Sequence, residues 1–445
     1  MDASDLPPEL QEMLREHAMP PAFSDDSLAL SFTDANRDRL RYVAMSGKWY
    51  EWTGTVWRED TTLHVFSLAR DLCRGVAAKA NESCRSLASS KTVNAVVSLA
   101  RADRRTATRL EQWDSNPLLL NTPDGTIMLE TGAIRDHEPA DYITMSTSVG
   151  PGGECPLWHA FLDRVTDGDL TLQAYLQRAA GYFLTGLTTA HALFFLFGLG
   201  ANGKSVFINT LTGIMADYYT TAPMGMLVAS RNERHPTELA GLVGKRLVTA
   251  IETEQGTRWD EAKVKALTGG DTIPARFMRQ DYFIFVPRFK LLIAGNHKPA
   301  LNSVDEAMRR RFNLVPFTVT IPEGERDEEL GNRLKEEWPG ILQWAVTGCV
   351  EWRKEGLNPP PKVTEATQEY LDSQNTIKNW LSECTMPEAS GEERSSDLFA
   401  SWKVWCDENG ERAGSNRSFS QSLKGLGVTS SHDRTGTVFY GLRKL

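Results

Sequence analysis

A glycine-rich octapeptide that follows directly on an apolar run is the feature that most constrains how this chain can fold. The apolar run covers residues 192–197, and the octapeptide Gly-Leu-Gly-Ala-Asn-Gly-Lys-Ser covers residues 198–205. Consecutive backbone N–H groups of such a turn form a concave anion nest, and a helix that begins there turns its positive end toward the anion. The sequence therefore predicts an α/β core in which a strand, a loop and a helix hold a nucleoside triphosphate.

Each fixed position of the octapeptide has a physical task. Gly198 and Gly203 keep the approach of the phosphates open, because side chains at those positions would block it. Lys204 is expected to reach the β and γ phosphates as a point charge, and Ser205 to offer its hydroxyl to Mg²⁺. An ordinary glycine-rich turn is the alternative. The residues predicted to contact ATP are Gly198, Gly200, Ala201, Asn202, Gly203, Lys204, Ser205 and Val206.

Length and composition exclude several other classes of protein. The chain has 445 residues, of which 41% are hydrophobic and 24% charged, as in globular proteins with more than one domain. No stretch approaches the length of a membrane span, and residues 1–8 lack the basic region and apolar run of a secretory signal. The cysteines include no Cys-x-x-Cys pair, which argues against a zinc ribbon. We therefore expect a cytoplasmic protein that does not interact with membranes.

The distribution of apolar periodicity, turn residues and charge predicts the organisation of the chain. Hairpin patterns around Gly54 and at Asp124-Gly125, with helical periodicity between them, indicate an α+β accessory domain. Two helices are expected before the nucleotide strand, and Pro339 is expected to divide a long amphipathic stretch into two helices. The expected boundaries are a mobile lead-in at 1–25, the N-terminal accessory domain at 26–150, a helical collar at 151–190, the nucleotide-binding core with a helical lid at 191–358, a helical linker at 359–393 and a C-terminal domain at 394–445.

Two carboxylates follow the next predicted strand. Residues 245–251 form a short β-branched run that ends before Glu252 and Glu254, at the end of a strand where an α/β sheet places its site. Their spacing of two would put both side chains on one face if the strand continued. One acid would then hold Mg²⁺ and the other polarise the attacking water, and the spacing leaves open which does which. Glutamates on a surface loop are the alternative.

An amide and a run of arginines complete the set of groups that nucleotide hydrolysis requires. Asn296 follows the predicted strand 288–295, where its amide can hydrogen-bond the γ phosphate and the water, although asparagine there is also typical of a plain turn. Arg310 and Arg311 precede a further apolar strand. In a ring of ATPase subunits such an arginine can reach the γ phosphate of the neighbouring subunit, which makes oligomerisation part of the predicted mechanism.

A hairpin with basic and aromatic residues is predicted between the acidic strand and Asn296. Residues 263–271 indicate a helix and a tight turn, and residues 276–285 indicate the hairpin. Such a hairpin could track a DNA backbone, and the alternative is an ordinary hairpin whose basic edge discourages aggregation. The DNA contacts predicted in this part of the chain are Lys265, Arg276, Arg279 and Lys298.

The end of the chain indicates a second DNA-binding module. Residues 397–409 and 418–426 are predicted helices and residues 428–442 a hairpin, which is the order of a winged-helix domain. From residue 412 onward six cations oppose one anion, although the whole chain has a formal net charge of −9. Arg417 and Lys424 are therefore predicted to contact DNA. A winged helix that docks on a protein is the alternative.

Taken together, these motifs resemble those of superfamily 3 helicases in order and spacing. They are similar in particular to the helicase halves of phage and plasmid primase-helicases of the poxvirus type. The resemblance implies an AAA+ type P-loop ATPase core, in a hexameric ring around one DNA strand, with 3′ to 5′ movement. The motifs that carry it are the phosphate loop at 198–205, the acidic strand end at 252–254, the Leu-Thr-Gly-Gly-Asp block at 267–271, the segment 289–299 and the segment 305–311.

The same resemblance assigns roles to single residues. It implies that Lys204 and Ser205 are the phosphate-loop pair, Glu252 the acid beside the metal and Asn296 the sensor. Arg310 or Arg311 is implied as the arginine finger. Family members often carry a tryptophan where this chain has Arg309, so the identity of the finger stays open. Full-length relatives also carry a primase domain, and residues 1–190 offer no obvious acidic cluster for nucleotidyl transfer, which predicts a helicase without its own primase.

The leading interpretation is an ATP- and Mg²⁺-dependent DNA helicase that acts in the replication of a phage, a plasmid or an integrated mobile element. Its expected partners are single-stranded and forked DNA, further copies of the chain, and a separate primase or host replication proteins. The enzymatic alternative is a replication initiator or helicase loader that remodels origin DNA without processive unwinding. The non-enzymatic alternative is a DNA-binding protein in which ATP acts as a structural switch.

Overall fold

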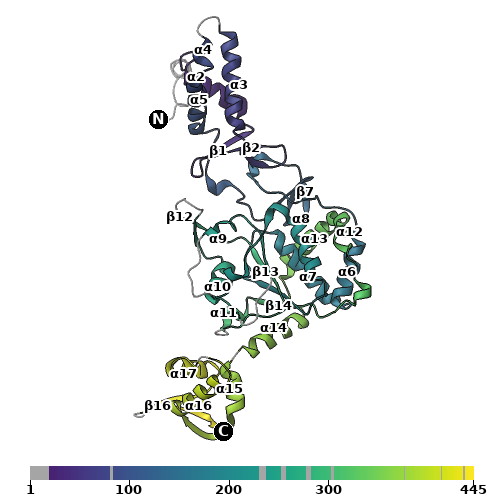
Figure 1. The fold of residues 1–445 in the computed structure, drawn as a ribbon, viewed down its shortest axis with the longest axis vertical. Coiled ribbons are helices and arrows are strands. Elements are labelled where there is room, and N and C mark those ends of the chain that lie inside the picture. The colour runs from purple at the N-terminus through teal and green to yellow at the C-terminus, as the bar shows by residue number, and fades with distance from the viewer. Residues whose placement is uncertain are drawn as a thin grey trace.

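The computed structural model shows three parts that follow one another along a long axis (Figure 1). Helices α2, α3 and α5 lie at one end, a domain around a parallel sheet lies in the middle, and a small C-terminal domain lies at the other end. The described residues are 20–80, 84–229, 237–251, 257–276, 282–301, 305–374, 376–411, 413–433 and 436–445. Within these ranges every helix is too short or too polar to span a lipid bilayer.

A five-stranded parallel sheet forms the centre of the molecule. Its strands are rich in aliphatic and aromatic residues, as expected where a sheet is covered on both faces. Because all the strands run the same way, their carboxyl ends meet at one edge, which is where α/β sheets place ligands. In spatial order the strands are β14 (Phe312–Pro316), β8 (Leu193–Phe197), β13 (Lys290–Gly295), β10 (Leu247–Ile251) and β9 (Tyr219–Thr221).

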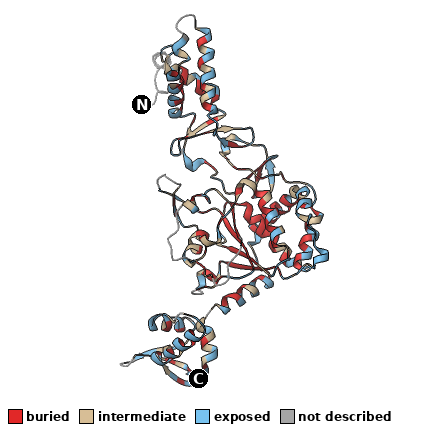
Figure 2. Ribbon diagram, viewed as in Figure 1, coloured by how far each residue is buried: buried red, intermediate tan, exposed pale blue. Residues whose placement is uncertain are grey.

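Helices cover both faces of this sheet, and alternate side chains of β8 divide between them. Phe194 and Leu196 pack with one group of helices, whereas Leu193 and Phe195 pack with the other. Figure 2 shows the buried residues concentrated in these layers. The first group is α6 (Pro156–Thr166), α7 (Leu170–Leu184), α8 (Lys204–Met215) and α13 (Trp338–Glu355). The second is α10 (Glu261–Gly269), α11 (Glu306–Arg309) and α14 (Pro361–Ser373).

Helices α6 and α7 confirm the two helices predicted before the nucleotide strand. The predicted break at Pro339 is also confirmed, because α12 (Leu330–Glu336) ends there and Pro339 lies in the first turn of α13. Helices α7 and α13 touch through glycine, since a Cβ at Gly181 would lie 2.0 Å from the backbone nitrogen of Cys349. Only glycine permits this approach of the two backbones.

The N-terminal part contains a helical cluster above a small sheet. The helices are α2 (Asp25–Asn36), α3 (His64–Lys79), α4 (Cys84–Leu87) and α5 (Ser90–Ala102). The sheet has the order β3 (Trp57–Glu59), β2 (Lys48–Trp52), β1 (Leu40–Val43) and β4 (Ala107–Thr108). The hairpin predicted around Gly54 and the helices predicted in this region are confirmed. Of the expected mobile lead-in, residues 1–19 lie outside the described residues.

The accessory domain expected at 26–150 is divided between two packing units. The hairpin predicted at Asp124-Gly125 forms, within a sheet of β5 (Leu119–Thr122), β6 (Gly125–Met128) and β7 (Ala133–Arg135). Its buried side chains Leu120 and Ile127 belong to the hydrophobic cluster of the central domain, not to that of the N-terminal helices. The hairpin is therefore part of the scaffold of the central sheet.

The boundary of the C-terminal domain requires a correction. The segment 359–393 is not a helical linker, because α14 packs on the sheet through Tyr370 and Leu371, whereas α15 (Thr376–Cys384) packs through Trp380 with the C-terminal residues. The next element, β15 (Thr385–Arg394), is a strand paired with the last strand of the chain. The domain then continues with α16 (Ser395–Glu408), α17 (Asn416–Gly425), β16 (Ser430–Asp433) and β17 (Gly436–Lys444), in a sheet of order β15-β17-β16.

Candidate active site

The loop between β8 and α8 has a conformation that requires glycine at two positions. Gly198 has a φ of +153°, and a Cβ on it would lie 2.0 Å from the carbonyl oxygen of Phe317. Gly203 has a φ of +85°, and its Cβ would lie 2.5 Å from Cγ1 of Val165 on α6. Both contacts are with the protein itself, so these two glycines fix the shape of the loop. A Cβ on Gly200 would meet nothing within 4 Å, so that position stays open for a ligand.

The buried side chain of Asn202 stabilises the loop by hydrogen bonds. Its side chain is 4% exposed, and its Nδ2 donates hydrogen bonds to the carbonyl oxygens of Phe317, at 2.9 Å, and of Leu199. The backbone nitrogen of Ile321 donates at 2.8 Å to the carbonyl oxygen of Ala201, which has a positive φ of +58°. The loop is therefore tied by hydrogen bonds to the chain that follows β14.

Lys204 connects the loop to the neighbouring strand. Its Nζ donates to the carbonyl oxygen of Gly198 at 2.6 Å, to Oδ1 of Asn202 at 3.2 Å and to Oδ1 of Asn296 at 3.4 Å. Asn296 follows β13, which lies beside β8 in the sheet. The structure thus brings together the phosphate-loop lysine and the amide that the sequence had placed at a strand end. Burial lowers the pKa of Lys204, because it penalises the charged ammonium.

The remaining predicted ATP contacts face outward. Ser205 and Ala201 are exposed, and Val206 lies half-buried in the first turn of α8. The hydroxyl of Ser205 and the first N–H groups of α8 are chemically suited to a Mg²⁺-phosphate group, since Mg²⁺ prefers oxygen ligands and a helix N-terminus favours anions. These donors match the ligand that the octapeptide predicts.

The predicted acids follow the strand on the other side of β13. Strand β10 pairs in parallel with β13, with Ile251 opposite Ala294, so its carboxyl end reaches the same edge of the sheet as Asn296. Glu252 and Glu254 come next in the chain but lie outside the described residues. The order of the strands places the carboxyl end of β10 two strands away from that of β8.

The two candidate finger arginines differ sharply in environment. Arg311 is 6% exposed, its Nε donates to Oγ1 of Thr268 at 3.0 Å, and its Nη1 donates to the carbonyl oxygen of Ala307 at 2.7 Å. Arg310 is exposed. An arginine that is held inside its own subunit cannot reach a neighbouring one, so the geometry favours Arg310 over Arg311 as a finger.

The residues predicted to contact DNA are spread over the molecule. Lys265 forms an ion pair with Asp305 and is therefore already engaged. Lys298 lies with its Nζ 4.1 Å from the ring centre of Phe197, at the end of β8, and so belongs to the surroundings of the phosphate loop. Burial lowers the pKa of Lys298.

The predicted hairpin itself is present. It consists of β11 (Ile273–Arg276) and β12 (Tyr282–Phe285), and the guanidinium of Arg276 lies 5.0 Å from the ring centre of Tyr282. The outer side chains Tyr282 and Ile284 are 62% and 72% exposed. Arg279 falls between the two strands, outside the described residues. Arg417 and Lys424 lie far along the chain, on α17 of the C-terminal domain.

One contact beside the candidate site was not predicted from the sequence. Tyr370 on α14 donates a hydrogen bond to the carbonyl oxygen of Pro299 and accepts one from Nε1 of Trp259 at 3.0 Å. Residue 299 belongs to the loop after β13 that begins with Asn296, so α14 supports the loop that carries this asparagine. The sequence had placed Tyr370 only within the expected helical linker at 359–393, since a tyrosine carries no signal for the distant carbonyl it will meet.

Two protein families match parts of this chain. Residues 29–167 match the family described as D5 N terminal like, and residues 196–311 match a family of unknown function, DUF5906. The first match runs from the N-terminal helices to α6. The second begins on β8 and ends at Arg311, and so includes the phosphate loop and Asn296.

Proteins of large DNA viruses have related sequences. "Putative helicase L207/L206" of Acanthamoeba polyphaga mimivirus is 26% identical over 329 residues, which are 67% of this chain and 34% of that protein. "Putative helicase 022R" of Frog virus 3 (isolate Goorha) is 25% identical over 291 residues, which are 60% of this chain and 29% of that protein. This chain therefore spans about a third of the length of these relatives.

Solved structures share the fold. The apo structure of the NrS-1 C terminal region has a TM-score of 0.54 at 10% identity, and the match covers 94% of this chain and 99% of that one. The A form apo structure of the same region has a TM-score of 0.51, with 94% of this chain and 100% of that one covered. The likeness includes all three parts of the molecule, and at this identity it concerns the fold alone.

Proposed function

This chain belongs to the D5-like primase-helicases, whose helicase region it represents, and from that premise we propose that it is an ATP-dependent DNA helicase. The viral relatives carry helicase names, which supports a role in DNA replication. We place it in superfamily 3, as a ring of subunits, with six the expected number, that moves 3′ to 5′ along one strand. Single-stranded and forked DNA are its proposed substrates, and a separate primase or host replication proteins its proposed partners.

The proposed architecture is an AAA+ type P-loop core followed by a winged helix. Support for the core comes from the strand order, in which β8 with the phosphate loop lies beside β13 with Asn296, and β13 lies beside β10. Support for the winged helix comes from the C-terminal order of helix, strand, two helices and a two-stranded hairpin. The central domain would supply the motor and the C-terminal domain a second contact with DNA.

The observation that carries the proposal is the contact set of the Lys204 ammonium. Its Nζ lies between the carbonyl oxygen of Gly198 and Oδ1 of Asn296, at the edge of the sheet where the strands end. A triphosphate in the loop would meet both side chains, with Lys204 on the β and γ oxygens and Asn296 on the γ phosphate and the attacking water. Bound Mg²⁺ would neutralise charge on the same oxygens.

The other proposed roles follow from position. Ser205 and Glu252 would hold the metal, and Glu254 or Glu252 would polarise the water. Arg310 is the proposed finger, because it is exposed whereas Arg311 is bound within its own subunit. Hydrolysis at the border between two copies would then move the hairpin of β11 and β12, with its Arg276 and Arg279, along the strand.

Strand displacement on a forked duplex is the deciding experiment. The unchanged chain should separate the strands with ATP and Mg²⁺, and Lys204→Ala should abolish both displacement and hydrolysis, because the phosphates lose their main cation. Lys354→Ala, at the exposed end of α13, is the matched control and should retain both activities. Strong DNA-stimulated hydrolysis by the unchanged chain without displacement would refute a helicase and indicate a remodelling ATPase.

A further inference from the structure

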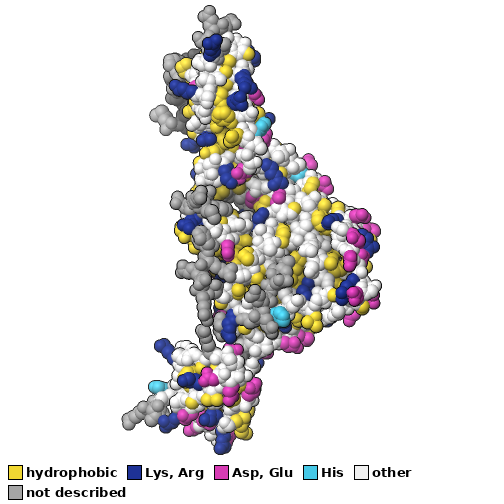
Figure 3. Space-filling model, in the orientation of Figure 1, with side chains coloured by type: hydrophobic (Ala, Val, Ile, Leu, Met, Phe, Trp, Pro, Cys, Tyr) yellow, Lys and Arg dark blue, Asp and Glu magenta, His cyan; other side chains and the backbone are white. Residues whose placement is uncertain are grey.

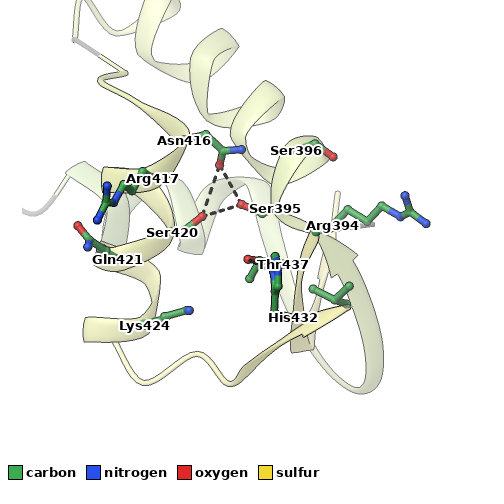
Figure 4. A pocket seen from close by; sticks show the side chains of 12 residues that line it. Arg394, Ser395, Ser396, Asn416, Arg417, Ser420, Gln421, Lys424, His432 and Thr437 are labelled. Atoms are coloured by element: carbon green, nitrogen blue, oxygen red, sulfur yellow. Dashed lines mark hydrogen bonds between the residues drawn. The ribbon is translucent and has the colours of Figure 1, made fainter. Parts of the chain in front are cut away.

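The C-terminal domain carries an open groove of about 530 Å³ that the motor does not use (Figure 4). Helix α17 forms one wall, the β16–β17 hairpin forms the other, and the start of α16 lies at the floor. Phe419 and Leu423, on the opposite side of α17, are buried in the hydrophobic core of the domain. This burial fixes which face of α17 lines the groove.

The groove is positively charged. Arg417 and Lys424 line it from α17 and Arg394 lies at its rim, whereas none of the described residues that line it is acidic. In Figure 4 the ammonium of Lys424 extends from α17 toward the side of His432 and Thr437. Figure 3 shows dark blue and cyan side chains on the side of this domain toward which the hairpin projects. A groove with this charge selects an anionic ligand.

Hydrogen bonds at the floor bring two helix starts together. Oγ of Ser395, the first residue of α16, donates to Oδ1 of Asn416 at 2.8 Å and lies 2.6 Å from Oγ of Ser420. Asn416 is the first residue of α17. The positive ends of two helices therefore open into the same groove. The helix ends and the cationic side chains both favour phosphate there.

The chemistry of the α17 wall favours duplex DNA over a single strand. His432 is the one aromatic side chain among the described lining residues, and no Phe, Tyr or Trp lies beside it, so the groove lacks the row of aromatic rings on which successive free bases stack. The wall instead presents Arg417 and Gln421, whose guanidinium and amide groups are of the kind that makes bidentate contacts with base edges in the major groove. The major groove is wide enough to admit an α-helix such as α17.

We propose that this groove is a duplex-DNA site that works without ATP. Lys424 and Arg394 contact backbone phosphates, and Arg417 and Gln421 contact base edges. The inference deepens the proposed function, on which it rests for DNA as the ligand. It adds a second DNA site, which binds the double helix. This site is separate from the one at which the motor holds the strand that it pulls.

Fluorescence anisotropy without nucleotide tests the site, with a short blunt duplex and a single strand of the same length as probes. Arg417→Ala and Lys424→Ala should each weaken duplex binding about tenfold. Lys424→Ala should also lower the slope of log affinity against log salt by about one, as for one lost phosphate contact. Both side chains are exposed, so the fold should not change, which thermal unfolding would verify.

Lys403→Ala, an exposed lysine on α16 outside the groove, is the matched control and should bind the duplex as the unchanged chain does. The proposal is overturned if Arg417→Ala/Lys424→Ala binds the duplex normally, if single-strand binding falls as much as duplex binding, or if Lys403→Ala weakens binding equally. Failure of the proposed ATP-driven function would give a different result. Loss of hydrolysis in Lys204→Ala, or its absence in the unchanged chain, leaves duplex binding intact.

Discussion

The glycines of the phosphate loop have different physical tasks, although the sequence pattern treats them alike. Gly203 has a positive φ and its hydrogen faces Val165 and Phe161 of α6, so it is required by packing. Gly200 has open space beside it, so a side chain there would meet the ligand and not the protein. The pattern predicted where the loop lies, but it could not separate these tasks, because α6 is distant in the chain.

Two alanine substitutions should therefore have opposite signatures. Gly203→Ala should destabilise the fold by about 1–3 kcal/mol, as a strained backbone position does, and should lower the unfolding temperature. Gly200→Ala should leave the unfolding temperature unchanged but weaken ATP binding, because its methyl group intrudes on the phosphate approach. Thermal unfolding and nucleotide titration measure the two effects. Equal stability loss in both variants would contradict the assignment.

A matched pair of arginine substitutions separates catalysis from structure. Arg310→Ala should reduce hydrolysis by about 10³-fold or more, the range measured for arginine fingers, with no change in unfolding temperature. Arg311→Ala should instead cost about 1–3 kcal/mol of stability, because the carbonyl oxygen of Ala307 and the hydroxyl of Thr268 lose a buried donor. ATPase assays beside unfolding curves test this. Normal hydrolysis by Arg310→Ala would exclude it as the finger.

At the scale of elements, the sequence predicted the helices and the hairpins well, the polar strand β16 included, but it missed one strand. Helices α6, α7 and α16 lie where the sequence placed them, because their apolar residues recur at helical spacing. Strand β15 was missed, since it contains Pro387 and several glutamates and takes its shape from pairing with β17 across an irregular register. Long-range pairing of this kind leaves no local signal.

The order of the strands in the sheet also could not be predicted from the sequence. The motifs at 198–205 and at Asn296 were expected to share one edge of the sheet. No local sequence pattern indicated, however, that β13 lies directly beside β8. The contact of Lys204 with Asn296 therefore had to be observed, whereas the residues themselves could be named from their positions at strand ends.

Helix α14 connects the loop after β13, which begins with Asn296, to the C-terminal domain. Tyr370 holds the carbonyl oxygen of Pro299, and Oε1 of Gln374 accepts a hydrogen bond at 3.0 Å from the backbone nitrogen of Leu301. Gln374 is the C-cap residue of α14, and α15 of the C-terminal domain begins at Thr376. Movement of the segment after Asn296 would thus be transmitted to the helix that carries the C-terminal domain.

Tyr370→Phe should weaken this connection. It removes the donor to Pro299 and the acceptor for Trp259, which should cost about 1–3 kcal/mol of stability and reduce the stimulation of hydrolysis by DNA. Tyr219→Phe on β9 is the control, because its hydroxyl bonds Thr249 at 3.1 Å on the far side of the sheet from β8. Unfolding and turnover with and without DNA are the measurements. Unchanged stimulation in Tyr370→Phe would argue against the connection.

At the scale of the whole molecule, the distribution of charge matters more than its sum. The net charge of −9 would repel DNA if it were evenly spread, yet the C-terminal groove is lined by cations without a described acid. Arg258 of the central domain pairs with Glu411 of the C-terminal domain at 3.1 Å, so the two domains also meet through opposite charges. If the groove binds DNA as proposed, the anionic remainder of the surface would help to confine DNA to it.

A motor that hydrolyses ATP at the border of two subunits predicts complementation between inactive variants. Lys204→Ala lacks the phosphate-loop cation but keeps its finger, whereas Arg310→Ala lacks the finger but keeps its loop. In a head-to-tail ring mixed at equal amounts, roughly a quarter of the borders would combine an intact loop with an intact finger. Hydrolysis should therefore reappear on mixing, although each variant alone is inactive. Size-exclusion chromatography must show that mixed rings form, and if they do, a lack of recovery at every ratio would mean that Arg310 does not act across the border.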